Sequence, residues 1–230
     1  HDPWCIGFFT DNEINWGGRE TDLAQWTLWS PEDQPARIEF VRRLAAKGLS
    51  VENVPETEMK AFSRVLVEEY FRRTREAVKE FDPDLLYLGC RFAGRAREWV
   101  IDACVKYCDV VSYNIYRHKI DDWRLPAGLD APVMVGEFHF GAHDRGLFGS
   151  GLINVGTQEK RAAAIKAYVD SALVNPQIVG VHWHQFSDQA TSGRFDGEHF
   201  QVGWTDICDR PYRETVEALR QIDLYGTRSK

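Results

Sequence analysis

Two glutamates, Glu13 and Glu137, each stand behind a short apolar run. Glu13 ends the string Thr-Asp-Asn-Glu, and Glu137 follows Val-Met-Val-Gly. Two carboxyl groups can cleave a glycosidic bond, because one protonates the leaving oxygen while the other attacks the anomeric carbon. In enzymes that retain the anomeric configuration, the two groups lie roughly 5–5.5 Å apart. A lone glutamate is more often part of an ion pair or a helix cap, since charged residues are mostly exposed.

Other polar and aromatic residues follow the remaining apolar runs. They are Arg91, Tyr113, Asn114, Tyr116, His139, His182, Trp183 and His184. In a parallel α/β barrel, catalytic residues converge at the carboxyl ends of the strands. This gathering favours a functional site over unrelated ion pairs. Three of the histidines, His139, His182 and His184, are an alternative metal site, but hydrogen bonding to a sugar explains them more simply, so we predict no metal.

The elements that must position these residues are short apolar strands alternating with amphipathic helices, a pattern typical of an α/β fold with a parallel sheet. The predicted strands are Trp4–Phe9, Leu85–Gly89, Val110–Asn114, Val133–Gly136 and Ile178–Trp183. The predicted helices are Pro35–Lys47, Glu56–Phe81, Arg95–Tyr107, Thr157–Leu173 with Thr157 as its cap, and Arg213–Ile222. Continuous apolar runs suit strands buried on both faces. No linker or repeat interrupts the chain, so we expect one domain over residues 1–230.

Composition indicates a globular protein with an uncharged partner. Apolar residues make up 43% of the chain, and eight Trp, eight Tyr and thirteen Phe provide aromatic faces that suit sugar rings. The net charge of −7 disfavours nucleic acid, whose recognition usually needs a basic surface. The sequence contains no apolar run of about 18 residues, so it predicts no membrane-spanning helix.

The termini and cysteines say little about location. The start, His1-Asp2-Pro3-Trp4, lacks the basic and apolar stretches of a signal peptide, so either the protein is not exported or the signal lies outside this sequence. Because five is an odd number, the cysteines cannot all pair in disulfides within the chain. We expect all of them to be buried small apolar residues.

Several longer strings resemble the β-agarases of glycoside hydrolase family fifty, which are similar to the retaining enzymes of clan A. These strings are Gly-Phe-Phe-Thr-Asp-Asn-Glu (7–13), Leu-Tyr-Leu-Gly-Cys-Arg-Phe-Ala (86–93), Cys-Asp-Val-Val-Ser-Tyr-Asn-Ile-Tyr (108–116), Val-Gly-Glu-Phe-His-Phe-Gly-Ala (135–142) and Gly-Val-His-Trp-His-Gln-Phe-Ser-Asp-Gln (180–189). The resemblance covers most of the chain. It implies a (β/α)8 barrel with the two glutamates on the fourth and seventh strands.

The resemblance also implies a role for each candidate residue. Glu13 would be the general acid/base and Glu137 the nucleophile. Asn12 would bind the sugar 2-hydroxyl, and Tyr113 or Tyr116 would orient Glu137. The remaining roles concern the pocket: Arg91, Asn114, His139, His182 and His184 would contact the sugar, and Trp183 would form an aromatic floor beneath it.

Only five βα units fit this sequence, corresponding to the fourth to eighth of the barrel. An open parallel sheet exposes strand edges, which natural proteins avoid. The chain is therefore a fragment of a longer enzyme, or its open edge is covered by its own segments, or it pairs with another copy. Pairing is physically the simplest solution, so we expect a homodimer or higher oligomer.

The sequence thus predicts an incomplete (β/α)8 barrel that hydrolyses β-galactosidic linkages with retention and without a cofactor. The expected partner is a neutral β-linked oligo- or polysaccharide, or a small β-galactoside. The alternative from another class is a non-catalytic carbohydrate-binding remnant of such a barrel.

Overall fold

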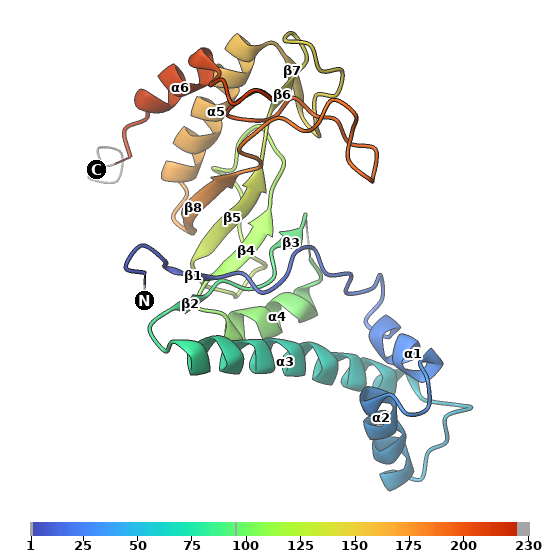
Figure 1. Cartoon of the computed structure of the whole chain (residues 1–230). Coiled ribbons are helices and arrows are strands. Elements are labelled where there is room, and N and C mark those ends of the chain that lie inside the picture. Colours follow the sequence, from blue (N-terminus) through green and yellow to red (C-terminus); the bar gives the residue numbers. More distant parts are fainter. Residues whose placement is uncertain (1, 95, 225–230) are drawn as a thin grey trace. The chain divides into compact units, whose positions relative to one another are not determined.

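The computed structural model describes residues 2–94 and 96–224. The chain forms two compact units, residues 1–111 and residues 112–230. Figure 1 shows the elements of both. The expectation of a single domain stays a prediction.

The first unit pairs two short parallel strands and adds four helices. Strand β1 (Gly7–Phe8) pairs with β2 (Leu86–Tyr87), with Gly7 opposite Leu86. The helices are α1 (Asp22–Trp29), α2 (Pro35–Ala46), α3 (Glu56–Phe81) and α4 (Glu98–Tyr107), and a further short strand is β3 (Phe92–Ala93). The long helix α3 contacts α1, α2 and α4, so it is the central helix of this unit (Figure 1).

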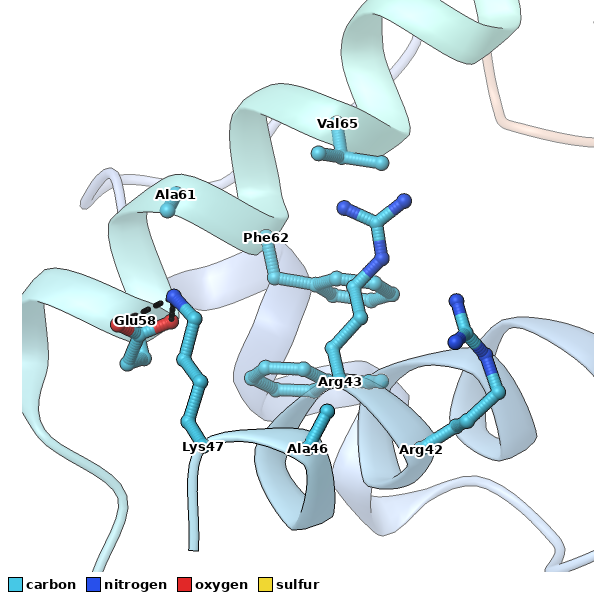
Figure 2. A pocket seen from close by; sticks show the side chains of 9 residues that line it. Arg42, Arg43, Ala46, Lys47, Glu58, Ala61, Phe62 and Val65 are labelled. Carbon is cyan, nitrogen blue, oxygen red and sulfur yellow. Dashed lines mark hydrogen bonds and ion pairs between the residues drawn. The ribbon is translucent and has the colours of Figure 1, made fainter. Parts of the chain in front are cut away.

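Helices α1, α2 and α3 share a small apolar core of their own. The rings of Phe40 and Phe62 stack at 4.0 Å between centroids, beside the buried Leu44. An open pocket of about 250 Å³ lies between α2 and α3. Two of the residues that line it, Lys47 just beyond α2 and Glu58 of α3, form an ion pair (Figure 2). This ion pair and the ring stack hold α2 against α3.

The second unit is a parallel sheet with helices α5 and α6. Strands β4 (Val111–Asn114), β5 (Val133–Phe138) and β8 (Ile178–Trp183) lie side by side in that order, and β5 runs parallel to β8. Helix α5 (Gln158–Leu173) contacts β8 and α6 (Arg213–Arg220). Strand β6 (Gly141–Ala142) pairs with β7 (Asn154–Gly156). The expected α/β fold with parallel strands is confirmed.

The predicted elements with strong periodicity are found, and the weaker ones differ. Helix α3 and strand β8 have the predicted bounds, and Thr157 caps α5 by accepting a hydrogen bond from the Lys160 N–H. Helix α4 begins at Glu98 because Arg97 is still extended, and Arg95 lies outside the described residues. Helices α2 and α6 end one and two residues early.

Three expectations about the strands and thiols are wrong. The chain from β4 to β5 contains no helix, so helices do not follow every strand. Only Gly7 and Phe8 of the first predicted strand are β-paired, and Phe8 is exposed, because β2 is its one partner in the described part of the first unit. Cys208 is exposed and two further cysteines are only half-buried.

No helix in residues 2–94 and 96–224 combines the length and the apolar character needed to cross a membrane.

Candidate active site

Glu137 lies on the sheet face opposite helix α5. Strand β5 continues through Glu137 to Phe138, two residues further than predicted. Side chains alternate along a strand, so these two residues point to opposite faces. The Phe138 ring stacks on Tyr168 of α5 at 4.1 Å. Glu137 therefore faces away from α5, and it is the one half-buried residue of an otherwise buried strand.

Tyr116 holds the carboxylate of Glu137. Its hydroxyl donates a hydrogen bond of 2.8 Å to Glu137 Oε2. The backbone fixes this contact, because the Ile115 N–H donates to the Glu137 carbonyl at 2.9 Å. Of the two tyrosines predicted to orient Glu137, the other, Tyr113, is buried and packs its ring on Trp123 at 4.9 Å. A donated hydrogen bond stabilises an ionised carboxylate, which is the form that a nucleophile needs.

His139 is braced by backbone groups. It is buried, its Nε2 accepts a hydrogen bond from the Leu152 N–H at 2.8 Å, and its Nδ1 lies 3.2 Å from the His184 carbonyl. Nδ1 must therefore carry the proton, so the ring is neutral. Burial, together with the neighbouring His184, lowers the pKa of His139 to about 4. This arrangement argues against the predicted contact of His139 with a sugar.

The end of β8 carries His182, Trp183 and His184. His182 is exposed and His184 half-buried. Trp183 donates its indole N–H to the Val202 carbonyl at 2.7 Å and packs on Phe138 at 5.2 Å. These contacts place Trp183 on the α5 face of the sheet with Phe138, which argues against the predicted floor beneath the sugar.

The metal alternative finds no support in these residues. Both ring nitrogens of His139 already face backbone groups, so it cannot join His182 and His184 as a ligand. In the part of the chain that the structure describes, no three His, Cys, Asp or Glu side chains are grouped as a metal site.

Glu13 and Arg91 lie next to each other in the first unit. The Thr10 N–H donates to the Gly89 carbonyl at 3.0 Å, and the Glu13 N–H donates to the Arg91 carbonyl at 3.1 Å. Glu13 and Arg91 have φ values of 53° and 44°, a left-handed backbone that is uncommon without glycine and that gathers at functional sites. The Arg91 guanidinium lies over the Phe9 ring at 5.4 Å. Asn12 and Glu13 are exposed.

The loop that carries Glu13 has an anchor that the sequence did not reveal. The Tyr70 hydroxyl of α3 donates to Asp11 Oδ2 at 2.7 Å and lies 3.2 Å from the Thr10 hydroxyl. Burial and the contact with Asp11 raise the pKa of Tyr70 well above its ordinary value, so it stays protonated as a donor. Tyr70 lies in the middle of a helical pattern, where an aromatic residue is usually read as packing.

A second buried network ties the segment after β8 to α5. Asp188 accepts hydrogen bonds from the Tyr212 hydroxyl at 2.5 Å and the Gly203 N–H at 2.7 Å. Arg161, fully buried in α5, donates to the Gly203 carbonyl at 2.7 Å. Burial raises the pKa of Asp188 and lowers that of Arg161 to about 10. A buried arginine cannot be recognised in a sequence without its partners.

Two curated proteins and two solved structures that are similar to this chain are agarases. No family model matches the chain. It is 34% identical to β-agarase B of Vibrio sp. (strain JT0107), over 100% of this chain and 28% of that protein, and 34% identical to β-agarase A of the same strain, over 96% and 22%. The crystal structure of an agarase matches 99% of this chain and 38% of its own, at 32% identity and a TM-score of 0.86. An exo-β-agarase structure matches 95% and 35%, at 35% identity and a TM-score of 0.82.

The chain therefore spans about a quarter of the curated relatives that it matches. Its α/β fold is that of the corresponding part of the agarase structures.

The neutral state of His139 predicts a pH dependence of stability. The unfolded chain takes up a proton near pH 6.5, whereas the folded chain does so only near pH 4. The neutral His139 therefore contributes fully to the free energy of unfolding above pH 6.5. This contribution is lost as the pH falls from 6.5 to 4, by about 3 kcal/mol in total. Urea unfolding of the wild type and of His139→Phe from pH 7.5 to 4.5 measures it. The wild type should lose stability relative to the variant, and a pH-independent difference would contradict the assignment.

Proposed function

We propose that this chain belongs to the family-fifty β-agarases and hydrolyses β-galactosidic linkages with retention of the anomeric configuration. The observation that carries the proposal is the hydrogen bond of Tyr116 to Glu137 at the end of a buried strand, on the face away from α5. The similarity to agarases over the whole chain supports the substrate class. The net charge of −7 is consistent with a neutral polysaccharide.

The proposed reaction is a double displacement by two glutamates. Glu137 attacks the anomeric carbon while Glu13 gives its proton to the departing glycosidic oxygen, which leaves a glycosyl ester on Glu137. Glu13 then removes a proton from water, and the resulting oxygen displaces Glu137 from the sugar. Asn12 binds the 2-hydroxyl, and its hydrogen bond strengthens in the transition state.

The remaining side chains of the proposed site supply sugar contacts. Arg91 is a hydrogen-bond donor for a sugar hydroxyl or ring oxygen. Asn114, His182 and His184 provide both donors and acceptors, as a polyhydroxylated and uncharged ligand requires. His139 and Trp183 are left out of these contacts, because their own hydrogen bonds run to the backbone.

The barrel is proposed to be incomplete, with βα units four to eight, and to be covered by another copy of the chain. Several large apolar side chains on and near β1 are exposed. In the first unit, Trp4 is 89% exposed and Phe81 is 76% exposed, and Ile6 and Phe8 are also exposed beside β1. Buried apolar area is the main drive for association, and patches of this kind mark interfaces.

A carbohydrate-binding remnant without activity is the second candidate. Because the chain matches 28% of one relative and 22% of the other, hydrolysis by the whole relatives does not carry over to it by similarity alone. Such a remnant would bind a galactan oligosaccharide and leave an aryl β-galactoside intact.

The catalytic proposal predicts the effect of changing each glutamate. Glu137→Ala and Glu13→Gln should each lower kcat on an aryl β-galactoside roughly a thousandfold or more, because each removes a reacting group. Azide should restore part of the rate to Glu137→Ala by taking the place of the nucleophile. The measurement is the release of the aryl group under saturating substrate. Glu159→Gln, an exposed glutamate of α5, is the matched control and should keep the wild-type rate.

A folded Glu137→Ala protein with the wild-type rate would reject the assignment. Saturable sugar binding by an inactive, folded wild type would establish the binding remnant instead.

Self-association predicts a mass of at least twice 26.5 kDa in sedimentation velocity. Trp4→Ser and Phe81→Ser should shift the protein toward the monomer, because they remove apolar area from the proposed interface. Phe195→Ser, an almost fully exposed residue of another loop, should leave the mass unchanged. A wild type that sediments as a monomer at all concentrations would show that another copy does not cover this surface.

A further inference from the structure

The ring of Tyr116 rests against the ring of His139. The two centroids lie 4.7 Å apart with an interplanar angle of 62°, an edge-to-face contact. Such a contact restricts a phenol that must aim its hydroxyl at one carboxylate oxygen. The phenol of Tyr116 is itself only half-buried, so the sheet alone leaves part of it open to solvent.

We propose that His139 is a positioning residue for the nucleophile, which holds the Tyr116 phenol on Glu137 and does not bind the sugar. This inference rests on the proposed function for its catalytic consequence. Its structural part, the dependence of the Tyr116 contact on His139, stands on the geometry alone.

The imidazole is fixed from two sides, so it is a rigid support. The Leu152 N–H reaches Nε2, and the His184 carbonyl faces Nδ1. The two groups come from the loop that precedes β7 and from the end of β8, which are far apart in the sequence. Together these two backbone groups fix the orientation of the His139 ring against which Tyr116 packs.

Gly151 shows how closely this loop approaches the imidazole. A Cβ at Gly151 would lie 2.4 Å from His139 Nε2, and its φ of 71° is a conformation that favours glycine. The loop therefore needs glycine here to bring the Leu152 N–H onto the ring. The same Nε2 cannot accept a second hydrogen bond from a sugar hydroxyl in the same direction.

The contact with Leu152 requires a neutral His139 ring. A protonated His139 would offer Nε2–H to the Leu152 N–H, so two donors would face each other. It would also place a cation against the phenol that serves Glu137. Burial favours the neutral ring, which is consistent with a support and not with a proton carrier.

The test is a double-mutant cycle on the 230-residue chain. It comprises His139→Ala, Tyr116→Phe and the double variant, with His139→Phe as a second version that keeps a flat ring in place. His143→Ala, an exposed histidine of the same unit, is the matched control. Circular dichroism verifies that each variant is folded.

The first readout is the ¹³C chemical shift of the Glu137 side-chain carboxylate at pH 7, assigned by its loss in Glu137→Gln. Tyr116→Phe defines the change that follows from losing the donated hydrogen bond. His139→Ala should move the resonance in the same direction by at least about half of that change, and the double variant should add nothing to Tyr116→Phe. An unchanged resonance in folded His139→Ala would overturn the proposal. His139→Phe, which keeps a flat ring beside Tyr116, should move the resonance less than His139→Ala does.

The second readout is kcat on an aryl β-galactoside. His139→Ala and Tyr116→Phe should each lower kcat about tenfold with little change in KM, and the double variant should be no slower than the slower single variant. Losses that multiply, or a rise confined to KM, would reject the positioning role. If the wild type hydrolyses nothing, the proposed function fails, while the Glu137 resonance still decides the role of His139.

Discussion

One hydrogen bond, from Tyr116 to Glu137, joins the ends of two neighbouring strands, and much of the second unit serves to keep it in place. The register of β4 against β5 brings the two residues together, through the Ile115 N–H and the Glu137 carbonyl. Tyr168 of α5 fixes the same point from the other face, since its hydroxyl donates to the Ile115 carbonyl at 2.9 Å while its ring stacks on Phe138. Backbone pairing in the sheet thus orients the Glu137 carboxylate, and the buried Tyr168 of α5 holds the same strand ends from the other face.

Buried polar groups help to hold the loops beyond the strands. Arg161 and Asp188 tie the segment after β8 to α5, and His139 ties the loop before β7 to β8. Burying such groups is unfavourable unless they form hydrogen bonds. Arg161 and His139 bond to backbone groups of these loops, and Asp188 bonds to the Gly203 N–H and to the Tyr212 hydroxyl. Polar anchors of this kind specify one loop conformation, which a pocket for a defined sugar requires.

The sequence predicted what depends on local pattern. The apolar periodicity of Glu56–Phe81 and the apolar run Ile178–Trp183 gave the right bounds for α3 and β8, and Thr157 was recognised as a cap from its residue type. Strands β3, β6 and β7 have only two or three residues, and their pairing depends on partners that no local pattern reveals. For the same reason the sequence placed His139 in a sugar pocket, because its partners Leu152 and His184 lie 13 and 45 residues away.

Covalent trapping tests the central claim, that Glu137 is the nucleophile of a retaining enzyme, most directly. The chain would be incubated with an activated 2-deoxy-2-fluoro-β-galactoside, digested, and its peptides sequenced by mass spectrometry. The fluorine slows breakdown of the glycosyl ester, so a retaining enzyme accumulates it on the nucleophile. We expect one fluorosugar per chain, attached to Glu137. A label on another carboxylate, or turnover of a galactoside that releases the inverted anomer first, would contradict it.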